Sequence, residues 1–107
     1  MSTDEQILDD YEVVVVGGGA AGLSAALVLG RSRRSVLVLD SGQPRNAPAA
    51  GVHGLLTRDG ISPAEYVAIG REEVRSYGGH VVDVEATVVR GDVDLGFVVV
   101  LSDGREV

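Results

Sequence analysis

The sequence of 107 residues contains neither cysteine nor lysine. Without cysteine, these residues cannot form a disulfide, a thiolate metal site or a redox-active dithiol. The nine basic residues are all arginine. The 16 acidic residues outnumber them, which gives a formal net charge of −7. An acidic chain with scattered arginines lacks the basic face that nucleic-acid binding requires. We therefore predict no nucleic-acid partner and no metal site.

Long apolar runs are also missing, so the sequence predicts no membrane-spanning segment. The first ten residues, MSTDEQILDD, are acidic and polar and do not resemble a signal peptide. We expect residues 1–10 to be a flexible acidic lead-in, residues 11–107 to form one domain, and the protein to be cytoplasmic.

The first half of the chain has the pattern of a βαβ unit. Glu12–Val16 and Ser35–Leu39 are short apolar runs typical of strands covered on both faces. Between them, Ala20–Gly30 contains helix-forming residues with apolar positions at helical spacing. The order predicts an α/β fold with a Rossmann-like parallel sheet.

A second helix is predicted after a long loop. Ser41–Ile61 is rich in glycine and proline and has no sustained period, which is typical of a functional loop. Ser62, Pro63 and Glu65 form a capping box, and Gly78-Gly79 would end the helix. Its apolar side is expected to carry Tyr66, Ile69, Val74 and Tyr77. The mixed charges of Arg71–Arg75 predict a solvated face, and His80 an exposed turn residue.

The last third of the chain predicts β-structure. His80–Val84 would be a third strand, and Ala86–Arg90 and Phe97–Leu101 an antiparallel pair. After a turn at Ser102–Gly104, residues 105–107 would begin a further strand. We therefore expect a β-meander that is incomplete at the C-terminus.

Three consecutive glycines at the end of the first strand form the pattern Gly17-x-Gly19-x-x-Gly22. In the dinucleotide fingerprint the first glycine permits the tight turn, the second the approach of a pyrophosphate, and the third close packing of helix on strand. The helix amides would then bind the phosphates. Ala20 and Ala21 keep the approach unobstructed.

The fingerprint also requires an acid at the end of the second strand, and Asp40 occupies that position. Its carboxylate would accept hydrogen bonds from both ribose hydroxyls and would repel a 2′-phosphate. The alternative is that the glycines only form a tight turn, which needs one glycine rather than three at this spacing. The βαβ pattern alone leaves FAD and NAD open.

The segment EVVVVGGGAAGLSAALVLGRSRRSVLVLDSGQPRNA resembles the N-terminal FAD-binding segment of thioredoxin-reductase-like flavoproteins, within the pyridine nucleotide-disulfide oxidoreductases. The following segment, with Arg45-Asn46, His53-Gly54 and Arg58-Asp59-Gly60, is similar to their dithiol-oxidase-like branch. The resemblance extends from Tyr11 to nearly the end of the chain. It implies an FAD-dependent oxidoreductase, with this chain as its FAD-binding N-terminal part.

The resemblance also implies roles for individual residues. Gly17, Gly19 and Gly22, with Ala20 and Ala21, would hold the FAD pyrophosphate, and Asp40 the adenosine ribose. The loop from Ser41 through Arg45 to Asn46 would follow the cofactor. Asn46 and His53 would lie near the flavin ring, and the Val88 backbone would border the adenine. No catalytic residue is expected among these 107 residues.

The chain also departs from the family, whose members are much longer. They carry a second dinucleotide domain for NAD(P)H, which contains a CxxC pair, and a dithiol or other small molecule would be the substrate. We expect these residues alone to be inactive and, with uncovered apolar surface, to need a homodimeric partner or a further C-terminal portion. The alternatives are a stand-alone or remnant dinucleotide-binding module without turnover, or an NAD-dependent dehydrogenase.

Overall fold

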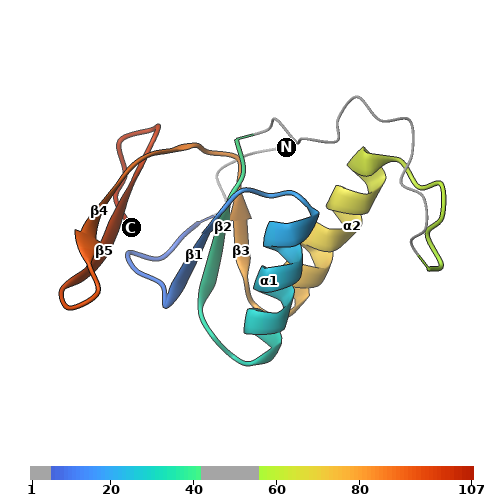
Figure 1. The fold of residues 1–107 in the computed structure, drawn as a ribbon, viewed down its shortest axis with the longest axis horizontal. Coiled ribbons are helices and arrows are strands. Elements are labelled where there is room, and N and C mark those ends of the chain that lie inside the picture. Colours follow the sequence, from blue (N-terminus) through green and yellow to red (C-terminus); the bar gives the residue numbers. More distant parts are fainter. Residues whose placement is uncertain (1–5, 42–55) are drawn as a thin grey trace.

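The computed structural model describes residues 6–41 and 56–107, which form a layer of two helices, a parallel sheet and an antiparallel hairpin (Figure 1). The elements follow in the order β1 (Val13–Val16), α1 (Ala20–Arg31), β2 (Val36–Leu39), α2 (Pro63–Ser76), β3 (His80–Val82), β4 (Ala86–Asp92) and β5 (Gly96–Leu101).

The parallel sheet has the strand order β1-β2-β3. Val13 is in register with Val36, and Leu37 with His80. All four residues of β2 are buried, as its uninterrupted apolar sequence predicts for a strand covered on both faces. The α/β class and the βαβ unit expected from the sequence are confirmed.

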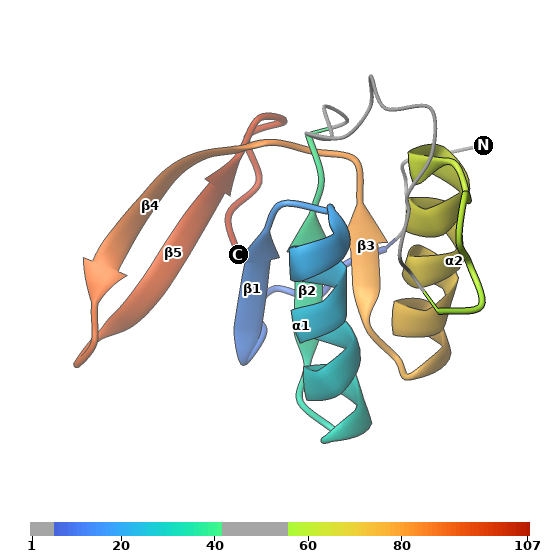
Figure 2. The same cartoon turned by 45° about the vertical axis from the view of Figure 1, so that its right-hand side comes forward.

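Helices α1 and α2 cover one face of the sheet (Figure 2). Their shared core consists of Leu23, Ala26, Val36, Val38, Val74 and Val81. The predicted apolar side of α2 is partly wrong, because Ile69 and Tyr77 are 38% and 52% exposed. Val67 packs against the core instead, so the inner face follows Val67, Gly70 and Val74.

Both ends of α2 have the structure that the sequence predicts. The Ser62 hydroxyl accepts a hydrogen bond from the Glu65 amide at 3.2 Å, and Pro63 is the first helical residue. At the other end, the chain leaves the helix through Gly78, whose φ is +88°. This left-handed conformation favours glycine because it has no Cβ.

The β4–β5 hairpin covers the opposite face of the sheet with its inner end. Its core cluster consists of Leu37, Leu39, Val82, Val99 and Leu101. Val107 exchanges backbone hydrogen bonds with Val99, so the predicted further strand begins as expected. The outer end carries the exposed apolar residues Val88, Val89, Val93, Leu95 and Phe97.

The start of β3 differs from the sequence prediction. His80 is half-buried rather than exposed, and it lies in the strand rather than in a turn. The hydroxyl of Tyr11 and His80 Nδ1 are 2.6 Å apart and share a hydrogen bond. The hydroxyl of Tyr11 also accepts from the Leu8 amide at 2.9 Å. This pairing connects the segment before β1 to the edge strand β3.

Within residues 6–41 and 56–107, neither helix has the length and apolar character that crossing a bilayer would require.

Candidate cofactor-binding site

The glycine-rich turn connects the end of β1 to the start of α1. Gly17 has a φ of +117°, a conformation that a side chain would strain. Its amide donates to the carbonyl of Leu39 at 2.8 Å, which extends the β1–β2 pairing by one residue. The first glycine therefore makes the sharp exit from the strand, as the sequence predicts.

Gly19 and Gly22 have opposite surroundings. A Cβ added at Gly22 would overlap the carbonyl oxygen of Gly17 and lie 3.2 Å from Val15 Cγ1, so only glycine allows the helix to lie this close to β1. A Cβ added at Gly19 would have no atom of residues 6–41 or 56–107 within 4 Å. The space beside Gly19, at the N-cap of α1, is therefore open to an approaching group.

The N-terminus of α1 has the features of an anion-binding site. In the described part of the chain, no side chain caps this helix and its first turn contains no acidic residue. The first amides of a helix have no intrahelical partner, and the positive end of the helix dipole adds to their attraction for anions. Ala20 and Ala21 add only methyl groups next to the open space. A diphosphate therefore fits this turn.

Asp40 lies at the carboxyl end of β2, beside the turn. It is 8% exposed, and its amide donates to the Val82 carbonyl at 3.0 Å. Its carboxylate contacts the turn directly, because a Cβ added at Gly18 would be 2.5 Å from Asp40 Oδ2. The predicted ribose acceptor and the predicted phosphate-binding turn therefore lie side by side.

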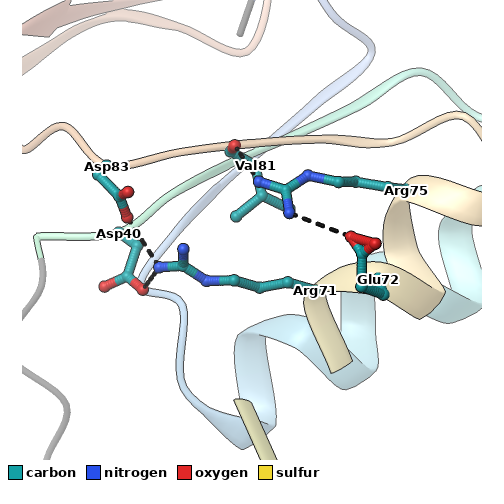
Figure 3. A network of polar contacts seen from close by, with 6 residues as sticks. All are labelled: Asp40, Arg71, Glu72, Arg75, Val81 and Asp83. Atoms are coloured by element: carbon teal, nitrogen blue, oxygen red, sulfur yellow. Dashed lines mark hydrogen bonds and ion pairs between the residues drawn. The ribbon is translucent and has the colours of Figure 1, made fainter. Parts of the chain in front are cut away.

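Two further charged residues join this site, and the sequence prediction missed both (Figure 3). Arg71 of α2 donates through Nη2 to Asp40 Oδ2 and to Asp83 Oδ1, the latter at 2.9 Å. Arg71 is half-buried, whereas the sequence predicts a solvated face for this part of α2. Its position between Val67 and Val74 on the inner face of α2 is the signal that could have revealed it.

The environment of Arg71 favours its charged form. Burial opposes the charge, but the hydrogen bonds to Asp40 and Asp83 outweigh burial and raise the pKa of Arg71. Its Nε is buried and has no hydrogen-bond partner among the described residues. The guanidinium is thus a permanent cation shared by the acids that follow β2 and β3.

The other predicted cofactor contacts are not all gathered at this turn. Ser41 is exposed directly after Asp40. Val88 is 50% exposed on β4, opposite Val100 in the hairpin layer and next to a register shift. Arg45, Asn46 and His53 lie outside the described residues.

Comparison with known proteins decides between the dinucleotide classes. Residues 12–68, more than half of the chain, match the family model described as an FAD binding domain. The chain belongs to this FAD-binding domain family. The match includes the glycine turn, α1 and Asp40, so the site described above falls within the family's own segment.

Relatives of this FAD-binding domain agree with the assignment. The thioredoxin reductase sirT of Leptosphaeria maculans is 38% identical over 98 residues, which cover 89% of this chain and 30% of that protein. The crystal structure of HlmI matches with a TM-score of 0.81 and 43% identity, over 95% of this chain and 33% of that one. The crystal structure of an oxidoreductase from Agrobacterium tumefaciens matches with a TM-score of 0.83 and 39% identity, over 91% of this chain and 33% of that one. The chain spans about a third of the length of these relatives.

Proposed function

We propose that this chain binds FAD at the turn between β1 and α1 and serves as the FAD-binding part of a thioredoxin-reductase-like oxidoreductase. The observation that carries the proposal is the open space at Gly19, beside the uncapped start of α1 and next to Asp40. The family match and the names of the relatives support the same assignment.

In this proposal each residue has one task. Gly17 turns the chain, and Gly19 leaves room for the pyrophosphate against the first amides of α1. Gly22 brings the helix close to β1, and Asp40 accepts hydrogen bonds from the adenosine ribose. We further propose that Ser41, Arg45, Asn46, His53 and Val88 contact the cofactor.

Once bound, FAD would supply the electron-transfer chemistry of the enzyme. These 107 residues contain no cysteine, so a redox dithiol has to come from a substrate or from another part of the protein. We propose a dithiol substrate by analogy with the relatives named thioredoxin reductases, and NAD(P)H as electron donor where a second nucleotide domain is present. We also propose a cytoplasmic location.

The test is the flavin spectrum of the purified full-length protein and of its Gly19→Ala variant. The added methyl group enters the space proposed for the pyrophosphate and contacts none of the residues that the structure describes. We expect FAD affinity to fall at least about tenfold, roughly 1.4 kcal/mol, while the unfolding temperature of the flavin-free protein stays unchanged. Ser24→Ala, on the exposed side of α1, is the matched control and should bind FAD normally.

Two results would contradict the proposal. A wild-type protein that neither retains nor rebinds FAD would refute the cofactor assignment. FAD affinity unaffected by Gly19→Ala would refute the position of the pyrophosphate. Bleaching of the flavin by NAD(P)H, followed by reoxidation with a disulfide, tests the oxidoreductase activity; bound FAD without bleaching would favour a binding module without turnover.

A further inference from the structure

The carboxylate of Asp40 is held by a residue from a distant part of the sequence. Arg71 follows Asp40 by 31 positions and reaches from α2 to the carboxyl end of β2. Figure 3 shows its guanidinium lying between Asp40 and Asp83, with one nitrogen donating to both carboxylates. The neighbouring Arg75 points elsewhere and donates to the Val81 carbonyl at 3.0 Å.

Both side chains of the Arg71–Asp40 ion pair are largely buried, which makes the pairing important for the stability of the Asp40 carboxylate. The side chains of Asp40 and Arg71 are 11% and 20% exposed, whereas that of Asp83 is 46% exposed. A buried carboxylate without a compensating partner is strongly disfavoured, so Asp40 depends on Arg71 more than Asp83 does. The Arg71–Asp40 ion pair therefore keeps a charged acceptor in the cofactor site.

Two of the contacts of Asp40 restrict where its carboxylate can lie. The backbone of Gly18 is on one side of it, and Arg71 binds its Oδ2. An ionised carboxylate has about four lone-pair positions, so accepting from Arg71 leaves capacity for ribose hydroxyls. The ion pair and a bound ribose are thus compatible.

We propose that Arg71 is a positioning residue for the cofactor: it fixes the Asp40 carboxylate in the orientation that accepts hydrogen bonds from the adenosine ribose. This inference rests on the proposed FAD site. Arg71 acts through Asp40 and does not itself touch the cofactor. A purely structural ion pair would instead fasten α2 to the sheet without affecting how the ribose is recognised.

The experiment compares FAD with its analogue that lacks the adenosine 2′-hydroxyl. Both are titrated into the flavin-free full-length protein, and binding is followed by flavin fluorescence. We expect wild-type protein to bind FAD about tenfold more tightly than the analogue, because hydrogen bonds to charged groups are among the stronger ones. In Arg71→Met this preference should fall below about threefold.

Control variants separate positioning from general loss of structure. Loss of stability alone would weaken both ligands equally and leave their ratio unchanged. Arg75→Met, which removes the neighbouring arginine that donates to Glu72 and to the Val81 carbonyl, should keep the wild-type ratio. Arg71→Lys keeps the charge but ends one bond short of the position of Nη2, and should give an intermediate ratio.

A wild-type ratio in folded Arg71→Met overturns the inference. If Arg71→Met does not fold, Arg71→Lys decides, and an unchanged ratio in that variant overturns it as well. Asp40→Ala, which removes both acceptor oxygens, distinguishes this failure from failure of the proposed site. If Asp40→Ala removes the preference and the Arg71 variants do not, only the role of Arg71 is wrong; if Asp40→Ala keeps the preference, Asp40 does not bind the ribose.

Discussion

The carboxylate of Asp40 lies against the backbone of Gly18, so closely that a Cβ at Gly18 would be 2.5 Å from Asp40 Oδ2. Gly18 is the middle residue of the glycine triplet and is not among the three glycines that the dinucleotide fingerprint specifies. The structure gives this additional glycine a reason of its own. It leaves room for the acid that the fingerprint expects at the end of the next strand.

This contact predicts that Gly18→Ala is destabilising. The obstacle is a carboxylate held in place by Arg71, so we expect the free energy of unfolding to fall by about 1–3 kcal/mol. Denaturant unfolding measures it. In a double-mutant cycle with Asp40→Ala the two losses should be less than additive, because the second change removes the obstacle. Fully additive losses would show that the contact does not matter.

Gly22→Ala should be more damaging than alanine at another helical glycine. The added Cβ would overlap the Gly17 carbonyl, and backbone atoms at a β1–β2 hydrogen bond cannot easily move. We expect a loss of about 3 kcal/mol or more. Gly70→Ala in α2 is the matched control: among the described residues its Cβ would meet only the Leu23 side chain, at 3.2 Å, and alanine favours the helix. Equal unfolding midpoints for the two variants would contradict this prediction.

Tyr11→Phe should loosen the segment before β1. The substitution removes the hydroxyl that His80 Nδ1 and the Leu8 amide share, while the ring remains edge-on to His80. We expect a loss of about 1 kcal/mol, together with faster amide exchange at Leu8. Tyr77→Phe, which removes a hydroxyl from a side chain that is 52% exposed, should change stability much less.

Glu12→Gln should change how stability depends on pH. The Ser35 amide, the largest cause, and then the Arg34 side chain lower the pKa of Glu12 below its ordinary value of 4.5. The contribution of this carboxylate is therefore fully present above pH 4.5 and is lost as the pH falls through the lower folded-state pKa. Thermal unfolding from pH 3 to 7 should give a small advantage of wild type at neutral pH that disappears in acid. Glu73→Gln, on the exposed side of α2, is the control. If the stability advantage of wild type over Glu12→Gln grew as the pH fell, the direction assigned to the Glu12 pKa shift would be wrong.

The sequence could predict the parts of the site that depend on local chemistry. The turn from Gly17 to Gly22, the helix after it and the position of Asp40 all follow from spacing, because each is determined within one βαβ unit. The capping box at Ser62 is local in the same sense and is confirmed. These features can be predicted without knowing which other elements pack against them.

Arg71 escaped prediction because its partners are distant. In the sequence, Arg71–Arg75 has mixed charges at spacings typical of pairs along an exposed helix face. Such a pair does occur between Arg75 and Glu72, at 3.4 Å. The charged partners of Arg71, however, follow β2 and β3, and only the packing of α2 on the sheet brings them within reach. The pairing of His80 with Tyr11, which are 69 positions apart, was missed for the same reason.

Strand β2 belongs to two hydrophobic cores at once. Val36 and Val38 point into the helical layer, and Leu37 and Leu39 into the hairpin layer. A shift of the β2 register by one residue would move the valines into the hairpin core and the leucines into the helical core. Both cores would then be packed with side chains of the wrong shape, so packing on each face disfavours the shift. Asp40 directly follows this doubly constrained strand, so the proposed ribose acceptor extends from a strand whose register is fixed by packing on both faces.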